Sequence, residues 1–389
     1  MRAGRWSKES CGKRRRFRKS GGERRSAAWV KEISTSTRSW RRSETPTRDG
    51  SWSSKTCCRT QTGRRRRTSA RTVSTWPRGG SERLSAFRFG LAGAGRMGRN
   101  HLRALGGSAE VEVAAIAEPS EATRRSLGPT VATVHEDLDA MLESGRLDAV
   151  LVCVPSDLHL ETVKRLLAAG MPTLCEKPVG ITASQAREAA ALVTSAGLPF
   201  QVGFWRRFVP MLKRLRERIV RGELGEIYMV ANYQWDAEPP GANFRAHSGG
   251  IFVDMGVHEF DQTRWLVEQE FGAISSLASG VAAEPWPGDP ESAHAIAALS
   301  GGTTAVVSLG RRFPLGDVCK VEVFGTRDAE ECKFLWPPTA DDTFFGALRL
   351  QAESFARHVR GGPLEGASAH DAAAALDAAE RAAAQTVTA

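Results

Sequence analysis

The feature that most constrains this chain is a glycine motif between a short apolar strand and a helix. Residues 87–92 (FRFGLA) have the composition of a buried strand, the motif GAGRMG follows at 93–98, and a helical stretch comes next, over 99–105. Such spacing allows a tight turn, a close approach of backbone amides to a pyrophosphate, and close packing of helix on strand. The motif predicts a dinucleotide-binding loop with five contact residues, Gly93, Gly95, Arg96, Met97 and Gly98.

An acidic residue after the next strand predicts which dinucleotide binds. The strand is expected over 111–117, and Glu118 follows it, 20 residues after Gly98. A carboxylate at this place can accept hydrogen bonds from both hydroxyls of an adenosine ribose and would repel a 2′-phosphate. The sequence therefore favours NAD, while Arg124 and Arg125 close by leave NADP as the alternative.

Strands and helices alternate as far as residue 207. We expect further strands over 147–154, 173–175 and 199–203, and helices over 157–169 and 183–196. Alternation at this spacing predicts a doubly wound parallel sheet with helices on both faces, a Rossmann domain over 86–207.

The pattern changes after residue 207. Helices are expected over 210–220 and 252–266, strands over 227–235 and 318–324, a hairpin over 295–309, and an Ala-rich helical tail from 344. A mostly antiparallel sheet packed on helices accounts for this pattern, so we expect an α+β domain over 208–389 that binds substrate and supports oligomerisation.

The net charge of +10 belongs to the first 85 residues. They hold 25 Lys and Arg against 6 Asp and Glu, five of the ten Trp and a single Leu, Leu84, so they cannot supply the apolar surface of a core. We expect this segment to be disordered. Three explanations stay open: a basic arm for nucleic acid, an organellar transit peptide, or sequence upstream of the true start that is no part of the natural protein, which we favour.

Several classes of protein are disfavoured. The seven cysteines form no CxxC pair, so the sequence indicates neither a disulfide framework nor a zinc ribbon, and a reducing cytoplasm is the expected location. No apolar run reaches 18 residues, so we expect no membrane-spanning helix.

Polar side chains follow two of the expected parallel strands. Ligands bind at the carboxyl ends of such strands, so Lys177 is a candidate for the junction of cofactor and substrate. A helix follows the first of these ends, and Ser156 or Asp157 suits its N-cap. The residues expected to border the cofactor here are Pro155, Ser156, His159, Glu176 and Lys177.

A stripe of three polar residues marks the expected helix 252–266. At about 100° per residue, Asp254, His258 and Asp261 fall within an arc of about 60°, and the flanking faces are apolar, so the stripe should line a cleft. A metal site built from His247, Asp254 and His258 is an alternative, but the chain has no HExxH or equivalent ligand motif, and we expect no metal.

Four motifs together resemble a known family. The GAGRMG start, CEKP at 175–178, VGFWRRF at 202–208 and GGIFVDMGVHEFD at 249–261 are similar to the Gfo/Idh/MocA oxidoreductases and, within them, to the inositol dehydrogenases. The resemblance covers residues from about 86 to the end. It implies a catalytic triad of Lys177, Asp254 and His258, with Arg206 or Arg207 at the border of the site. Inositol dehydrogenases carry Asn-Pro where this chain has Trp235-Asp236, so the exact polyol stays open.

The expected function is NAD-dependent oxidation of a secondary alcohol of a cyclitol or sugar. His258 suits the base, Lys177 would support the reacting oxygen, Asp254 would bind a neighbouring hydroxyl, and Asp261 would fix the imidazole tautomer. Period-two alternation places Asn232, Gln234 and Asp236 on one strand face as candidate readers of ring hydroxyls. The alternatives are an NAD-dependent glycosidase and a non-catalytic nucleotide-binding or nucleic-acid-binding protein. We expect a small polyol partner and a homodimer or homotetramer.

Overall fold

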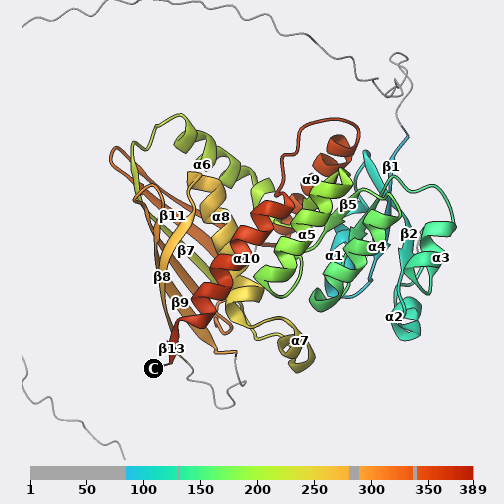
Figure 1. The fold of residues 1–389 in the computed structure, drawn as a ribbon, viewed down its shortest axis with the longest axis horizontal. Coiled ribbons are helices and arrows are strands. Elements are labelled where there is room, and N and C mark those ends of the chain that lie inside the picture. The colour runs from blue at the N-terminus through green and yellow to red at the C-terminus, as the bar shows by residue number, and fades with distance from the viewer. Residues whose placement is uncertain (1–84, 130–131, 280–288, 336–339, 389) are drawn as a thin grey trace, which may run out of the picture. The chain divides into compact units, whose positions relative to one another are not determined.

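Two sheets organise the part of the chain that the computed structural model describes, residues 85–129, 132–279, 289–335 and 340–388 (Figure 1). These residues all belong to one compact unit. The basic segment that we expected over residues 1–85 lies outside the described residues except for Ser85. The domain boundaries at 86–207 and 208–389 stay predictions.

The first sheet is parallel, and a helix connects each strand to the next. Its spatial order is β3 (Thr133–His135), β2 (Val111–Ala117), β1 (Phe87–Ala92), β4 (Ala149–Val152), β5 (Thr173–Cys175) and β6 (Phe200–Val202). The connecting helices are α1 (Arg96–Leu105), α2 (Glu121–Ser126), α3 (Leu138–Glu143), α4 (His159–Ala168) and α5 (Ala183–Ala196). Strand β4 is apolar throughout because both of its faces are buried. The order reverses between β1 and β4, which confirms the predicted Rossmann fold.

The second sheet has seven strands and is mostly antiparallel, as predicted. Its order is β12 (Ala329–Leu335), β11 (Val318–Gly325), β7 (Ile227–Trp235), β10 (Thr304–Gly310), β9 (Ser292–Leu299), β8 (Phe271–Ser279) and β13 (Thr386–Thr388). Two of its pairs, β7 with β10 and β8 with β13, are parallel. Alternate residues of β10 (Ala305, Val307 and Leu309) are buried, so one face of this sheet packs on helices.

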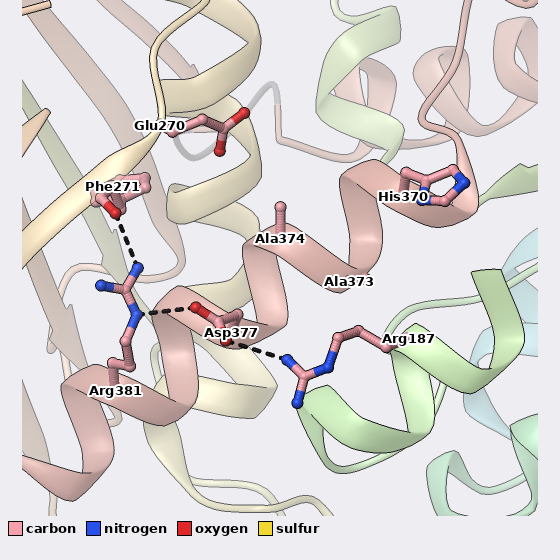
Figure 2. A pocket seen from close by; sticks show the side chains of 8 residues that line it. All are labelled: Arg187, Glu270, Phe271, His370, Ala373, Ala374, Asp377 and Arg381. Carbon is pink, nitrogen blue, oxygen red and sulfur yellow. Dashed lines mark hydrogen bonds and ion pairs between the residues drawn. The ribbon is translucent and has the colours of Figure 1, made fainter. Parts of the chain in front are cut away.

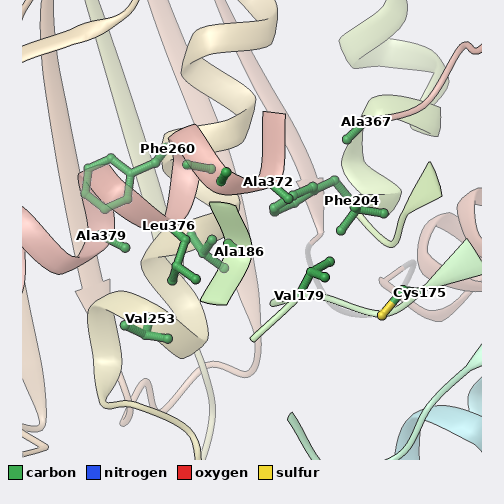
Figure 3. Packing of buried hydrophobic residues seen from close by; sticks show 14 of the residues in the cluster. Cys175, Val179, Ala186, Phe204, Val253, Phe260, Ala367, Ala372, Leu376 and Ala379 are labelled. Carbon is green, nitrogen blue, oxygen red and sulfur yellow. The ribbon is translucent and has the colours of Figure 1, made fainter. Parts of the chain in front are cut away.

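Two helices near the end of the chain pack on both halves of the described unit. The helices of this part are α6 (Pro210–Val220), α7 (Ala242–His247), α8 (Val257–Val267), α9 (Ala340–Val359) and α10 (Ala369–Ala384). Small side chains on α10 allow a close approach to α5, and Figure 3 shows Leu376 of α10 between Ala186 of α5 and Phe260 of α8. Helix α9 inserts Phe355 beside Phe89 of β1, with ring centroids 6.2 Å apart.

The helix expected over 252–266 differs from its prediction. Residues Phe252–Gly256 form a π-helical turn, and the α-helix α8 runs on from Val257. Asp254 thus lies on a wider turn than His258 and Asp261, which breaks the straight polar stripe predicted at 100° per residue. The N-cap prediction for α4 is wrong as well, because Ser156 and Asp157 lie in a turn of 3-10 helix and Leu158 precedes α4 without a side-chain cap.

Candidate active site

The glycine loop has the geometry of a pyrophosphate cradle. Gly93 has a φ of 92°, which favours glycine, and a Cβ on Gly98 would lie 2.1 Å from the carbonyl oxygen of Gly93. A Cβ on Gly95 would meet no described atom within 4 Å, so open space lies beside the start of α1. No side chain caps this helix N-terminus, which leaves its amides for an anion. The loop therefore fits the cofactor predicted from its sequence.

Glu118 lies next to this loop, at the end of β2. Its Oε2 accepts a hydrogen bond from the amide of Ala94 at 2.8 Å, and its Oε1 accepts one from the amide of Ser120 at 2.9 Å. A carboxylate has about four acceptor positions, so capacity remains for ribose hydroxyls. Of the two arginines that left NADP as the alternative, Arg124 donates to the carbonyls of Glu118 and Pro119 and pairs with Glu136, and Arg125 pairs with Glu121. The site therefore favours NAD.

Lys177 and Asp254 meet although 77 residues separate them. Lys177 follows β5 at the carboxyl end of the first sheet, and its Nζ donates to the main-chain oxygen of Asp254 at 2.7 Å. The same Nζ lies 3.5 Å from Oδ1 of the Asp254 side chain. Both side chains keep some exposure, 16% for the lysine and 12% for the aspartate, so a small ligand can reach them. An ammonium group has three donors, which leaves capacity for a substrate oxygen.

His258 lies one helical turn further on, in an apolar setting. The rings of Phe204 and Trp205 pack edge-on against it, with centroids 5.8 Å and 6.3 Å away. Burial, together with the positive charges of Lys177 and Arg206, holds the pKa of His258 well below its ordinary value. The imidazole is therefore neutral at pH 7, the state that a proton acceptor requires.

The predicted role of Asp261 is wrong. Both of its carboxylate oxygens accept hydrogen bonds from Arg207, at 2.9 Å and 2.6 Å, in a buried bidentate pair. Nδ1 of His258 has no hydrogen-bond partner among the described residues. The two-pronged guanidinium thus holds the aspartate, and Asp261 does not fix the tautomer.

Arg206 or Arg207 was predicted to border the site, but both side chains are buried and neither is open to a substrate. Arg207 pairs with Asp261 and with Asp371 of α10, so it ties two helices together. Arg206 lies 2.6 Å from Glu259 and donates to Oε1 of Gln234, also at 2.6 Å. It therefore holds the side chain of Gln234 in place.

Gln234 and Asp236 form a polar pair at the end of β7. Nε2 of Gln234 donates to Oδ1 of Asp236 at 3.3 Å. Burial raises the pKa of Asp236 to about 6, and the neighbouring charges of Asp254 and Asp317 add to that rise. Asn232 shares this strand face but is fully buried, and its amide is used by Thr263 and Gln262.

Two of the other residues predicted to contact the cofactor, His159 and Glu176, instead contact neighbouring parts of the protein. The ring nitrogens of His159 contact the carbonyl oxygens of Pro178 and Val154, at 2.6 Å and 2.9 Å. Glu176 is buried against His101, with Oε1 and Nε2 2.7 Å apart. His159 and Glu176 hold the strand ends in place, so their predicted role changes from contact to support. Pro155 and Ser156 lie in the turn between β4 and α4, near these strand ends.

Two charged residues of the site were not predicted. Arg311 directly follows β10, is fully buried, and donates to Oδ2 of Asp254 at 3.2 Å. Asp289 in turn accepts from Arg311 at 3.0 Å. The available signal was a charged residue directly after an apolar strand. The two partners are too far apart in sequence for any periodicity to pair them.

Two surface hollows lie outside this site. Figure 2 shows a surface hollow between α5, α10 and the start of β8, where Asp377 pairs with both Arg187 and Arg381. A second hollow is lined by Arg216, Arg264 and their acidic partners.

In the described ranges, no three His, Cys, Asp or Glu side chains gather as metal ligands, so His247, Asp254 and His258 do not form that alternative site. None of the described helices is long and apolar enough to cross a membrane.

Comparisons with known proteins agree with this geometry. Residues 87–204 match the family described as "Oxidoreductase family, NAD-binding Rossmann fold", and residues 212–329 match the "GFO/IDH/MocA C-terminal domain". The chain is 47% identical over 302 residues to the "Rhizopine catabolism protein MocA" of Rhizobium meliloti, covering 77% of this chain and 95% of that protein. It is 32% identical over 244 residues to an "Inositol 2-dehydrogenase" of Rhizobium meliloti (strain 1021), covering 62% of this chain and 74% of that protein.

A solved structure shares the fold as well. The crystal structure of myo-inositol 2-dehydrogenase from Lactobacillus plantarum matches with a TM-score of 0.68 and 25% identity. The match covers 77% of this chain and 97% of that one.

Proposed function

This chain belongs to the Gfo/Idh/MocA oxidoreductase family, and we propose that it is an NAD-dependent dehydrogenase of a cyclitol such as inositol, or of a related sugar. The observation that carries the proposal is the meeting of Lys177 and Asp254 at the carboxyl end of the Rossmann sheet, beside a neutral His258. Similarity to an inositol 2-dehydrogenase supports the choice of substrate class.

Each catalytic group has a task that fits its surroundings. His258 accepts the hydroxyl proton, because its depressed pKa keeps the imidazole free to do so. Lys177 orients the reacting oxygen and stabilises its developing negative charge. Asp254 binds a neighbouring hydroxyl through Oδ1. Bound NAD+ would supply the hydride acceptor.

Recognition of the rest of the ring falls to the end of β7. Gln234 and Asp236 form one polar pair there, and Asp236 interacts electrostatically with Asp254. A carboxylate and an amide can accept from and donate to successive ring hydroxyls. We assign substrate contacts to this pair, with Arg206 orienting Gln234 from behind.

Net formation of NADH tests the proposal. Purified protein is incubated with NAD+ and a panel of inositol isomers and pyranoses, and NADH is followed by its absorbance, with NADP+ in parallel. We expect NADH with at least one cyclitol and a clear preference over NADP+, because of Glu118. A glycosidase of this family would instead release a leaving group from a glycoside with no net NADH, and that result would replace our proposal.

We also propose that the chain assembles as a homodimer or homotetramer through the outer face of its second sheet and works in the cytoplasm. On that face Leu277 and Ile296 are 44% and 55% exposed, unusually open for large apolar side chains on neighbouring strands. The described cysteines are buried free thiols, which suits a reducing compartment. Light scattering should give a multiple of the chain mass, and Ile296→Glu should lower it.

A further inference from the structure

The two carboxylate oxygens of Asp254 have different partners. Oδ1 faces Lys177, whose Nζ lies 3.5 Å away and makes its shorter bond to the main-chain oxygen of Asp254. Oδ2 accepts from Nη1 of Arg311 at 3.2 Å. The two oxygens of a carboxylate are equivalent, so the arginine fixes the plane of the group, with one oxygen held by Arg311 and the other turned toward Lys177 and a ligand.

Arg311 is itself held rigidly. Its Nη2 and Nε both donate to Oδ1 of Asp289, at 3.0 Å and 3.2 Å, and its own amide donates to the carbonyl oxygen of Glu291 at 2.8 Å. The other oxygen of Asp289 accepts from Arg245 of α7 at 2.7 Å. Arg311 is fully buried, so solvent cannot replace any of these contacts.

Neutralising charge does not by itself explain the contact with Asp254. Asp289 already gives Arg311 a carboxylate partner with two hydrogen bonds, and Lys177 already gives Asp254 a cation. What the contact adds is orientation, and Asp254 needs it because this residue lies in the π-helical turn Phe252–Gly256 rather than in regular helix.

We propose that Arg311 is a positioning residue for the reaction: it holds Oδ2 of Asp254 so that Oδ1 faces Lys177 and the substrate hydroxyl. The inference rests on the proposed function, since it assigns a task within the same site. Arg311 acts through Asp254 and needs no contact with substrate. Asp289 serves as its anchor, and Arg245 connects this anchor to α7.

Two substitutions of Arg311 separate geometry from charge. Arg311→Lys keeps the charge but loses the planar fork, whereas Arg311→Met loses both. We expect both to lower kcat/KM for the polyol by about 10- to 100-fold, with a raised KM, because small misplacements of a substrate-binding group cost about that much. Binding of NADH, measured by fluorescence, should stay within about twofold.

The pH profile separates the charge of Arg311 from its geometry. Lys177 faces Asp254, and Asp289 pairs with Arg311. Asp236 interacts electrostatically with Asp254, Asp317, Arg206, Glu259 and Arg311, and the Arg311 charge opposes the rise in the pKa of Asp236. Arg311→Met should therefore move the acid limb of kcat/KM to higher pH, and Arg311→Lys should leave that limb in place. The matched control is Arg312→Gln, which removes a neighbouring charge paired with Glu291 and should keep the parent's kinetics.

The outcomes separate this inference from the proposed function. An active parent whose Arg311→Lys variant keeps its KM and kcat, and loses only thermal stability, overturns the inference alone. A parent that oxidises no polyol overturns the proposed function and the inference with it. If the Arg311 variants do not fold, Asp289→Asn loosens the anchor while keeping the arginine. It should lower kcat/KM by a smaller factor, and parent values there would also overturn the inference.

Discussion

His258 is kept neutral by its own surroundings. Phe204 and Trp205 exclude water from the ring, and Lys177 and Arg206 place positive charge nearby, so both burial and repulsion lower its pKa. A base whose pKa is depressed stays unprotonated at lower pH than an ordinary histidine does. The same surroundings make the group costly at acid pH, because the unfolded chain protonates it below about 6.5 while the folded chain does not.

Replacing His258 by alanine should remove the base. We expect His258→Ala to lower kcat by about 10²–10⁴-fold, since that is the usual contribution of a general base, with NADH affinity nearly unchanged. In the parent the acid limb of kcat/KM should lie below pH 6.5, and in the variant the part of that limb due to His258 should vanish. An acid limb unchanged in the variant would assign the base to another residue, with Lys177 the next candidate.

Asp236 should show a conflict between stability and function. Its pKa of about 6 lies above the ordinary 3.8, so the folded protein becomes less stable as the pH rises from about 4 through 6 and this carboxyl ionises at a cost. Asp236→Asn removes that cost. It should raise the free energy of unfolding at pH 7 by up to about 3 kcal/mol, and the gain should shrink toward pH 4.

This is checked by measuring the free energy of unfolding of the parent and of Asp236→Asn by chemical denaturation at pH 7 and pH 4. The KM of both proteins for the polyol is measured as well. The variant should be more stable and bind substrate less well. A destabilised variant with an unchanged KM would show that Asp236 is an ordinary structural residue.

Residues in short motifs were predictable, whereas the acidic partners of the buried arginines were not. Lys177, Asp254 and His258 lie in short motifs next to strand ends or on one helix, so the sequence alone pointed to them. The Arg311–Asp289 pair joins a strand end to the segment before β9, and the burial of Arg206 and Arg207 depends on Glu259, Asp261 and Asp371. Only tertiary structure selects those partners.

At the scale of elements, the strand–loop–helix unit at the start of the described chain was predictable from sequence, because its glycines are required by the local backbone geometry. The helix around Asp254 did not, since a π-helical turn changes the angular spacing without changing the apolar pattern. The parallel pairing of β7 with β10 also went unpredicted, because pairing between distant strands leaves no local mark.

The glycine loop offers a matched pair of substitutions. Gly95→Val should fold normally, because a Cβ there meets nothing within 4 Å among the described atoms and the backbone has a negative φ, but it should block the pyrophosphate and abolish NADH binding. Gly98→Ala should lower the melting temperature, because its Cβ would lie 2.1 Å from the carbonyl oxygen of Gly93. Calorimetry and NADH fluorescence on both variants check this. If Gly95→Val bound NADH as the parent does, the cradle would lie elsewhere.

At the scale of the whole described unit, α9 and α10 pack on both halves, so we expect the two sheets to unfold together. Phe355 of α9 lies in the apolar cluster around β1, and α10 packs on α5 as well as on α8. A change in α9 should therefore destabilise the Rossmann half, although α9 follows six of the seven strands of the second sheet in sequence.

Phe355→Ala should lower the free energy of unfolding by about 3–5 kcal/mol, the usual cost of removing a fully buried phenylalanine. Denaturation followed both by far-UV circular dichroism and by loss of NADH binding should give coincident transitions. The contrary result would be two transitions in the circular dichroism of Phe355→Ala, with NADH binding lost at the same denaturant concentration as in the parent. The two halves would then unfold independently.

Hydride transfer from a polyol carbon to NAD+ is the reaction that we propose for this site. The most direct test uses a cyclitol identified by the NADH screen, deuterated at its carbinol carbons, in a single turnover with excess enzyme, and mass spectrometry of both products. We predict one deuterium in the reduced cofactor for each ketone formed, and a rate that falls by about 10²–10⁴-fold in His258→Ala while the label still arrives at the cofactor. Reduced cofactor without deuterium, or a deuterated sugar product with no net reduced cofactor, would contradict it.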